Sequence, residues 1–133
     1  MIVVDATVLV DFLAGEKELK TSAQELAFED SRWISVGLWR YEVGNVFLKL
    51  VRRKKESLDP SELGEILRDT RVLLIDSVDE VDPGGIWSIA VDSGLTYYDA
   101  SYVWLAETRG LTLRTRDKEI LEKFPHLARP MPR

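Results

Sequence analysis

Short apolar runs alternate with helix-forming stretches along nearly the whole chain. Four such runs, at residues 2–4, 33–36, 72–75 and 111–113, have the composition of buried strands. Each is separated from the next by a stretch with helical spacing of apolar residues, and strands joined through helices pair in parallel. The alternation therefore predicts an α/β fold, a three-layer α/β/α sandwich around a parallel sheet of four to five strands.

The helix boundaries are indicated by turn and capping residues. Pro60 suits the first turn of a helix, and Gly94 and Gly110 suit helix C-caps. The prolines at 125, 130 and 132 indicate an irregular end of the sequence. The predicted helices, in chain order, are a stretch that follows Asp5 and ends near Gly15, residues 17–29, 38–55, a short segment from Pro60, 78–91, 99–109 and a short helix from Asp117.

Length and composition limit the class of protein and the chemistry. With 133 residues, 45% of them hydrophobic, we expect one globular domain over residues 1–133. No apolar run is long enough to span a bilayer and no leader precedes Asp5, so we expect a cytoplasmic protein with no membrane partner. Zero cysteines exclude disulfides and zinc–sulfur sites, and the single His126 cannot build a multi-histidine site. Oxygen ligands remain, which favour hard divalent cations.

Four acids stand where such a fold would bring them together. Asp5 ends the first apolar run, Asp117 follows the last, and Glu42 and Asp99 each open a helical stretch. Because ligands of open α/β sheets bind outside the carboxyl ends of the strands, we expect Asp5, Glu42, Asp99 and Asp117, the acid cluster, at one sheet edge. Converging carboxylates repel one another unless a divalent cation lies among them. The sequence therefore predicts a Mg²⁺ or Mn²⁺ site with phosphodiester hydrolysis as its chemistry.

Each acid taken singly also has a structural interpretation. Asp5, Asp99 and Asp117 each precede a helical stretch and could be N-caps, whereas Glu42 could form a solvated charge pair. Thr7 could cap the first helix or position a metal-bound water. The four acids together on one edge favour the metal site.

Further residues complete the predicted site. Asp5, Glu42 and Asp99 are expected to bind the metal directly, Asp117 at a second site or through water, and Thr7 and Thr115 to orient water or carboxylates. Glu119 is an outer candidate. The candidates for RNA contact are Arg116, Lys118, Lys49 and the basic run 52–55, which could also complement a helix end. Tyr97, Tyr98 and Trp104 could stack on bases or pack in the core or a dimer.

Four segments of the chain carry a resemblance to a known family. They are Met1–Val10, Tyr41–Val46, Leu95–Ala100 with Leu105–Ala106, and Thr115–Asp117. Their order and spacing resemble the PIN-domain family, and most closely the VapC-type toxins of toxin–antitoxin pairs. The resemblance implies a Mg²⁺- or Mn²⁺-dependent endoribonuclease that acts on RNA. It also implies a homodimer that is held inactive by a VapB-type antitoxin, whose C-terminal segment fills the catalytic groove.

Three other functions are alternatives to the nuclease. A haloacid-dehalogenase-like phosphatase needs a second Asp two residues after the first, where this chain has Thr7, and a receiver-like phosphoacceptor needs paired acids there. A catalytically silent PIN-fold interaction module is the non-enzymatic alternative. The intact acids count against the silent module, and a divalent-metal titration would distinguish the two.

Overall fold

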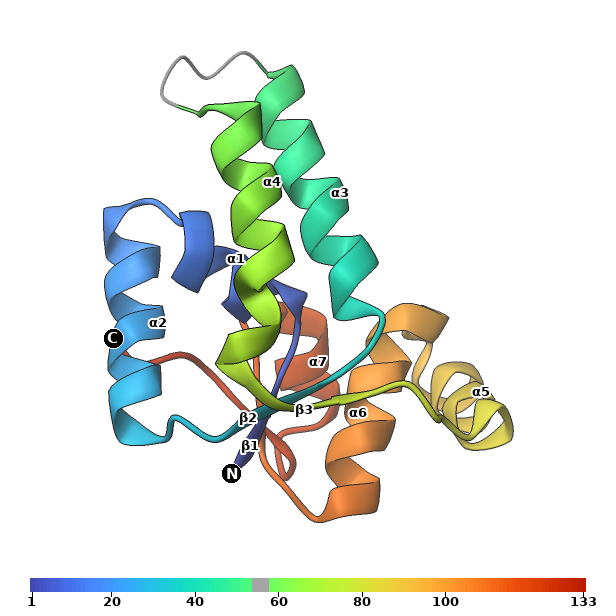
Figure 1. Cartoon of the computed structure of the whole chain (residues 1–133). Coiled ribbons are helices and arrows are strands. Elements are labelled where there is room, and N and C mark those ends of the chain that lie inside the picture. The colour runs from blue at the N-terminus through green and yellow to red at the C-terminus, as the bar shows by residue number, and fades with distance from the viewer. Residues whose placement is uncertain (54–57) are drawn as a thin grey trace.

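Five short strands form one parallel sheet in a computed structural model that describes residues 1–53 and 58–133 (Figure 1). The strand order is β3-β2-β1-β4-β5, and every neighbouring pair is parallel. This confirms the predicted sheet at the upper end of the expected strand number. The strands are β1 (Ile2–Val4), β2 (Trp33–Val36), β3 (Leu74–Val78), β4 (Leu113–Arg114) and β5 (Ala128–Arg129).

Helices cover both faces of the sheet and complete the three layers (Figure 1). Successive side chains of a strand point to opposite faces, so Ile2 and Val4 pack into one core and Val3 into the other. Within the described ranges, no helix is both long and apolar enough to cross a membrane. One face carries α1 (Ala6–Ala14), α2 (Lys17–Glu29), α3 (Trp39–Arg52) and α4 (Pro60–Asp69), and the other α5 (Pro83–Ser93), α6 (Tyr97–Arg109) and α7 (Lys118–Lys123).

The third strand lies further along the chain than predicted. Residues 70–73 form a 3-10 turn, and the strand runs over Leu74–Val78 instead of 72–75. Because β3 is an edge strand, Ile75 and Asp76 are exposed to solvent, and the strand has no continuous apolar run to mark it. Because the position of β3 was misjudged, the helix that was predicted to begin at residue 78 was also placed too early. Val78 belongs to the strand, and α5 begins at Pro83, capped by Asp82.

The end of the chain is more regular than its prolines suggest. The amide of Leu111 bonds to the Ala106 carbonyl at the end of α6, so β4 begins later, at Leu113. Residues 128–129 form a fifth strand beside β4, which ends before Pro130, since proline has no N–H to extend a ladder. Gly94 and Gly110 have positive φ at the C-caps of α5 and α6, as predicted. Helix α3 ends at Arg52, and the predicted extension to 54–55 lies outside the described residues.

The strand order places a topological switch point between β1 and β4. The chain adds β2 and β3 on one side of β1 and then returns to add β4 and β5 on the other. At such a point the two helical connections leave in opposite directions and open a crevice at the carboxyl ends of the strands. Asp5 directly follows β1 and Thr115 directly follows β4, so both stand at this crevice.

Candidate active site

Asp5 is the N-cap of α1 and is fully engaged by hydrogen-bond donors. Its Oδ1 accepts from the backbone amides of Thr7 at 3.1 Å and Val8 at 3.3 Å, and from the Thr7 hydroxyl at 2.5 Å. Burial raises the pKa of the Asp5 carboxyl, while hydrogen bonds from Thr115, Thr7 and Val8 favour the ionised form. Asp5 therefore both caps a helix and presents a rigidly held carboxylate at the crevice.

The loop between β4 and α7 joins Asp5 to Asp117. The buried Thr115 hydroxyl donates to Oδ2 of Asp5, and the amide of Asp117 donates to the same Thr115 oxygen at 2.9 Å. Asp117 caps α7 by accepting from the Ile120 amide at 3.1 Å. Thr115 therefore links Asp5 to Asp117 through hydrogen bonds on both sides.

Glu42 is held by a residue that the sequence analysis missed. The hydroxyl of Tyr102, on α6, donates to Glu42 Oε1 on α3 at 2.5 Å. Tyr102 is 1% exposed, and burial together with the charge of Glu42 raises its pKa, so the phenol keeps the proton that it donates. The signal in the sequence was Tyr102 three residues after Asp99, on the same side of α6.

Asp99 lies in the first turn of α6 without capping it. Thr96 is the N-cap and accepts from the Asp99 amide at 3.1 Å, so the N-cap interpretation of Asp99 was wrong. Burial raises the pKa of the Asp99 carboxyl to about 6, and the charges of Asp117, Glu42 and Asp5 add to this against a hydrogen bond from Thr96. All three other members of the acid cluster therefore act on Asp99.

The donor chemistry of the acid cluster suits a hard divalent cation. Its ligand atoms are all oxygens, and mutual repulsion with burial favours a bound positive charge. In the described part of the chain, however, no three Asp, Glu, His or Cys side chains are arranged to hold a metal ion. The charges of Asp117, Glu42 and Asp5 all act on Asp99, so the four carboxylates lie close enough to interact electrostatically.

The predicted RNA-contact residues have different surroundings. Lys49 on α3 and Lys118 at the start of α7 are exposed. Arg116 is instead bound to Asp11 of α1, an acid that is 2% exposed and that the sequence analysis did not assign. The outer candidate Glu119 accepts from Lys123 at 2.7 Å.

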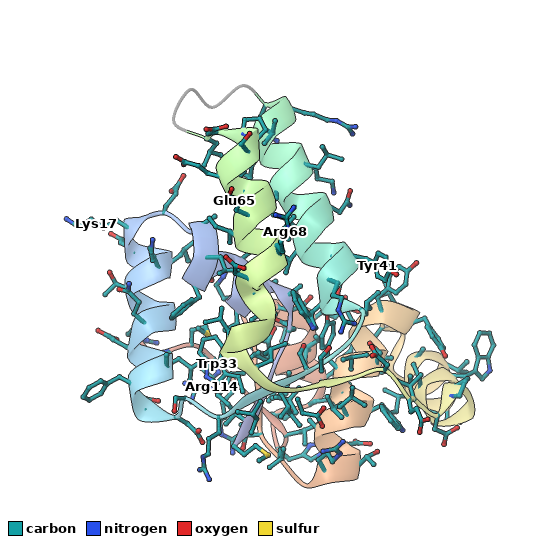
Figure 2. All side chains as sticks on the ribbon, in the orientation of Figure 1. Lys17, Trp33, Tyr41, Glu65, Arg68 and Arg114 are labelled. Atoms are coloured by element: carbon teal, nitrogen blue, oxygen red, sulfur yellow. The ribbon has the colours of Figure 1, made fainter. Side chains whose placement is uncertain are left out.

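The aromatic candidates divide in the same way. Trp104 is partly buried and packs against the core on the face of the sheet that carries α5, α6 and α7, whereas Tyr97 and Tyr98 are exposed. Tyr41, the residue before Glu42, is exposed at the end of α3 nearest α6 (Figure 2). The three exposed tyrosines line a pocket of about 310 Å³, together with Arg40 and Asp79 among others.

A family model for the PIN domain matches residues 2–127 of the chain. The chain belongs to the PIN-domain family. This chain is 33% identical over 131 residues to ribonuclease VapC3 of Pyrobaculum aerophilum, and the match covers 97% of this chain and 98% of that protein. It is 40% identical over 85 residues to exonuclease VapC9 of the same organism, a match that spans 62% of this chain and 60% of VapC9.

Solved structures share the fold of this PIN domain. PAE2754 from Pyrobaculum aerophilum superimposes with a TM-score of 0.73 at 27% identity, covering 92% of this chain and 84% of that one. A toxin–antitoxin complex from Klebsiella pneumoniae gives 0.65 at 17% identity, with 93% and 90% covered. FitAcB from Neisseria gonorrhoeae gives 0.62 at 18% identity, with 96% of both chains covered. The last two similarities concern the fold alone.

The Tyr102–Glu42 hydrogen bond should contribute measurably to stability. We expect Tyr102→Phe to cost about 1–2 kcal/mol, because the bond is made to a carboxylate in a mostly buried setting. For a domain of this size that lowers the melting temperature by about 3–8 °C. The measurement is thermal unfolding at pH 7 without metal. Tyr41→Phe is the matched control, since Tyr41 is 77% exposed, and an equal melting temperature for both variants would contradict the prediction.

Proposed function

We propose that this PIN domain is a Mg²⁺- or Mn²⁺-dependent endoribonuclease, the toxin of a toxin–antitoxin pair. The observation that carries the proposal is the interaction among the four acids, since the charges of Asp117, Glu42 and Asp5 all raise the pKa of Asp99. Membership of the PIN family and the similarity to a protein named ribonuclease VapC3 support the reaction class. The oxygen-only donor set supports the choice of a hard cation.

Each side chain of the acid cluster has a proposed role. Asp5, Glu42 and Asp99 would hold the ion, and Asp117 would act at a second site or through water. When bound, the ion would supply a water of lowered pKa and neutralise charge on the phosphate. Thr7 and Thr115 keep Asp5 oriented through the bonds described above, and Tyr102 does the same for Glu42.

The proposed partners are RNA, a VapB-type antitoxin and a second copy of the chain. The toxin–antitoxin complex among the structural neighbours supports an antitoxin partner at the level of the fold. We propose that the C-terminal segment of the antitoxin fills the catalytic groove. The homodimer and the cytoplasmic location remain predictions, which sizing of the purified protein and fractionation of cells would test.

Cleavage of a circular RNA tests the proposed activity. We expect Mn²⁺-dependent opening of the circle, since an endonuclease needs no free end, and no opening with chelator. This substrate also separates the proposal from exonuclease activity, the activity in the name of VapC9. If linear RNA is degraded while the circular RNA stays intact, the protein is an exonuclease and the endonuclease proposal is wrong.

A silent PIN-fold interaction module is the second candidate. It is favoured by one observation, that no three acidic side chains in the described residues are arranged for metal binding. Calorimetric titration with Mn²⁺ distinguishes the two. Heat of binding that disappears in Asp5→Asn supports the nuclease, whereas no heat at any concentration supports the silent module.

A further inference from the structure

The loop between β4 and α7 binds α1 at two separate points. Thr115 donates to Asp5 at the start of α1, and the next residue, Arg116, donates through Nε and Nη2 to the two carboxylate oxygens of Asp11. The Nη2–Oδ1 distance is 2.8 Å. Asp11 is six residues beyond Asp5, so the two points are about 9 Å apart along the helix. Two points so far apart fix the orientation of the loop as well as its position.

The Asp11–Arg116 pair is a partly buried, bidentate ion pair. The Asp11 side chain is 2% exposed and that of Arg116 is 39% exposed. A carboxylate as buried as Asp11 requires a partner, and the planar guanidinium matches both of its oxygens, which an ammonium cannot do. Because Asp11 already neutralises Arg116, the pair offers less attraction to a phosphate than a free arginine would.

We propose that Arg116 and Asp11 are positioning residues of the acid cluster, and that Arg116 does not act by binding RNA. The proposal rests on the function proposed above. Arg116 lies between Thr115, whose hydroxyl donates to Asp5, and Asp117, whose side chain caps α7. Anchoring Arg116 on α1 therefore sets the place of Asp117 and the angle of Thr115. The Asp117 amide bond to Thr115, at 2.9 Å, stiffens the same turn.

A double-mutant cycle over the pair tests the proposal. Asp11→Asn and Arg116→Gln are each expected to weaken Mn²⁺ affinity and lower kcat by about 10–100-fold, the range for residues that orient metal ligands. KM for RNA should change little. The double variant should be no worse than either single variant, because both remove the same contact. Arg109→Gln is the matched control, since Arg109 is 42% exposed, pairs with Asp76 and lies at the opposite end of α6 from Asp99.

The positioning role and a phosphate-binding role of Arg116 predict different effects of Asp11→Asn on RNA binding, with little change in the first case and tighter binding in the second. If Arg116 binds phosphate, removing Asp11 frees its charge and tightens RNA binding. In that case Arg116→Gln would raise KM and reduce the salt dependence of binding by about one ion. Either result would overturn the proposal, as would wild-type kcat and metal affinity in Asp11→Asn.

Two further measurements keep the test independent of folding and of RNA cleavage. Hydrogen exchange at the Asp117 amide of the metal-free protein should accelerate in Arg116→Gln and stay unchanged in Arg109→Gln, and unchanged exchange in both would overturn the proposal. If Arg116→Gln is unstable, Arg116→Lys keeps the charge but loses the bidentate contact, and it should still lower metal affinity. A parent protein that binds Mn²⁺ without cleaving RNA would refute the nuclease, while calorimetry on the variants would still decide the role of the pair.

Discussion

Asp99→Asn is expected to lower metal-dependent RNA cleavage by about 100-fold or more while making the metal-free protein more stable at pH 7. Loss of a metal ligand removes several kcal/mol of transition-state stabilisation, and 2.7 kcal/mol corresponds to about 100-fold in rate. The stability gain arises because the charged Asp99 carboxylate is disfavoured by burial and by Asp117, Glu42 and Asp5. After solvent screening we expect a gain of about 1–2 kcal/mol.

The pH dependence of this gain follows from the raised pKa of Asp99. Folding raises the pKa from 3.8 to about 6, so the folded state binds the proton more tightly than the unfolded state. The favourable contribution of protonated Asp99 is complete below pH 3.8 and is lost as the pH rises through 6. The difference in melting temperature between Asp99→Asn and the parent should therefore grow from pH 4 to pH 7.

The matched control for this substitution is Asp92→Asn, at an exposed position near the end of α5. It removes the same charge from a site away from the crevice, so we expect cleavage at the parental rate. An Asp99→Asn variant that cleaves RNA at the parental rate would remove Asp99 from the metal site. An Asp99→Asn variant that is less stable than the parent at pH 7 would contradict the electrostatic argument and leave the assignment of Asp99 to the metal site unaffected.

Addition of Mn²⁺ is expected to raise the melting temperature of the parent protein by about 5–10 °C. An ion that binds only the folded state at 100 times its Kd contributes about 2.7 kcal/mol. Each kcal/mol shifts the melting temperature of a domain of this size by about 2–4 °C or somewhat more. Here the ion also relieves the repulsion among four carboxylates. The measurement is thermal unfolding with Mn²⁺ and again after excess chelator, which should return the melting temperature to its original value.

Comparison of each variant with and without the ion separates this effect from intrinsic stability. Asp5→Asn should lose most of the Mn²⁺-dependent shift, and Asp92→Asn should retain it. The same shift in Asp5→Asn as in the parent would place the bound ion elsewhere on the molecule.

The parts of the fold that were predicted correctly are those in which local sequence and burial agree. β1 and β2 are central strands with helices on both faces, so every residue of each is buried and the runs Ile2–Val4 and Trp33–Val36 are marked by their composition. β3 and β5 are edge strands with exposed residues, so their composition resembles that of loops. Their position depends on pairing with a neighbouring strand, and a local sequence pattern does not record that pairing.

The acid cluster was predicted from its relation to strand ends and from a family resemblance. The carboxylates follow strands or open helices, and parallel strands bring those points to one edge. Asp99 appeared to be a helix cap because a local pattern cannot distinguish the cap at Thr96 from an acid three residues later. Tyr102 and Asp11 were missed because their partners, Glu42 and Arg116, are distant in the sequence.

The order of residues alone therefore determined the α/β alternation and the buried central strands, since each depends on neighbours within a few positions. Together with the family resemblance, it also predicted four acids at one edge of the sheet. Tertiary structure decided how those acids are held and charged. The hydroxyls of Tyr102 and Thr115, the anchoring of Arg116 on α1 and the raised pKa of Asp99 all arise between segments 60 to 110 residues apart or from burial. Such contacts form only when the sheet brings the segments together and excludes water from the space between them.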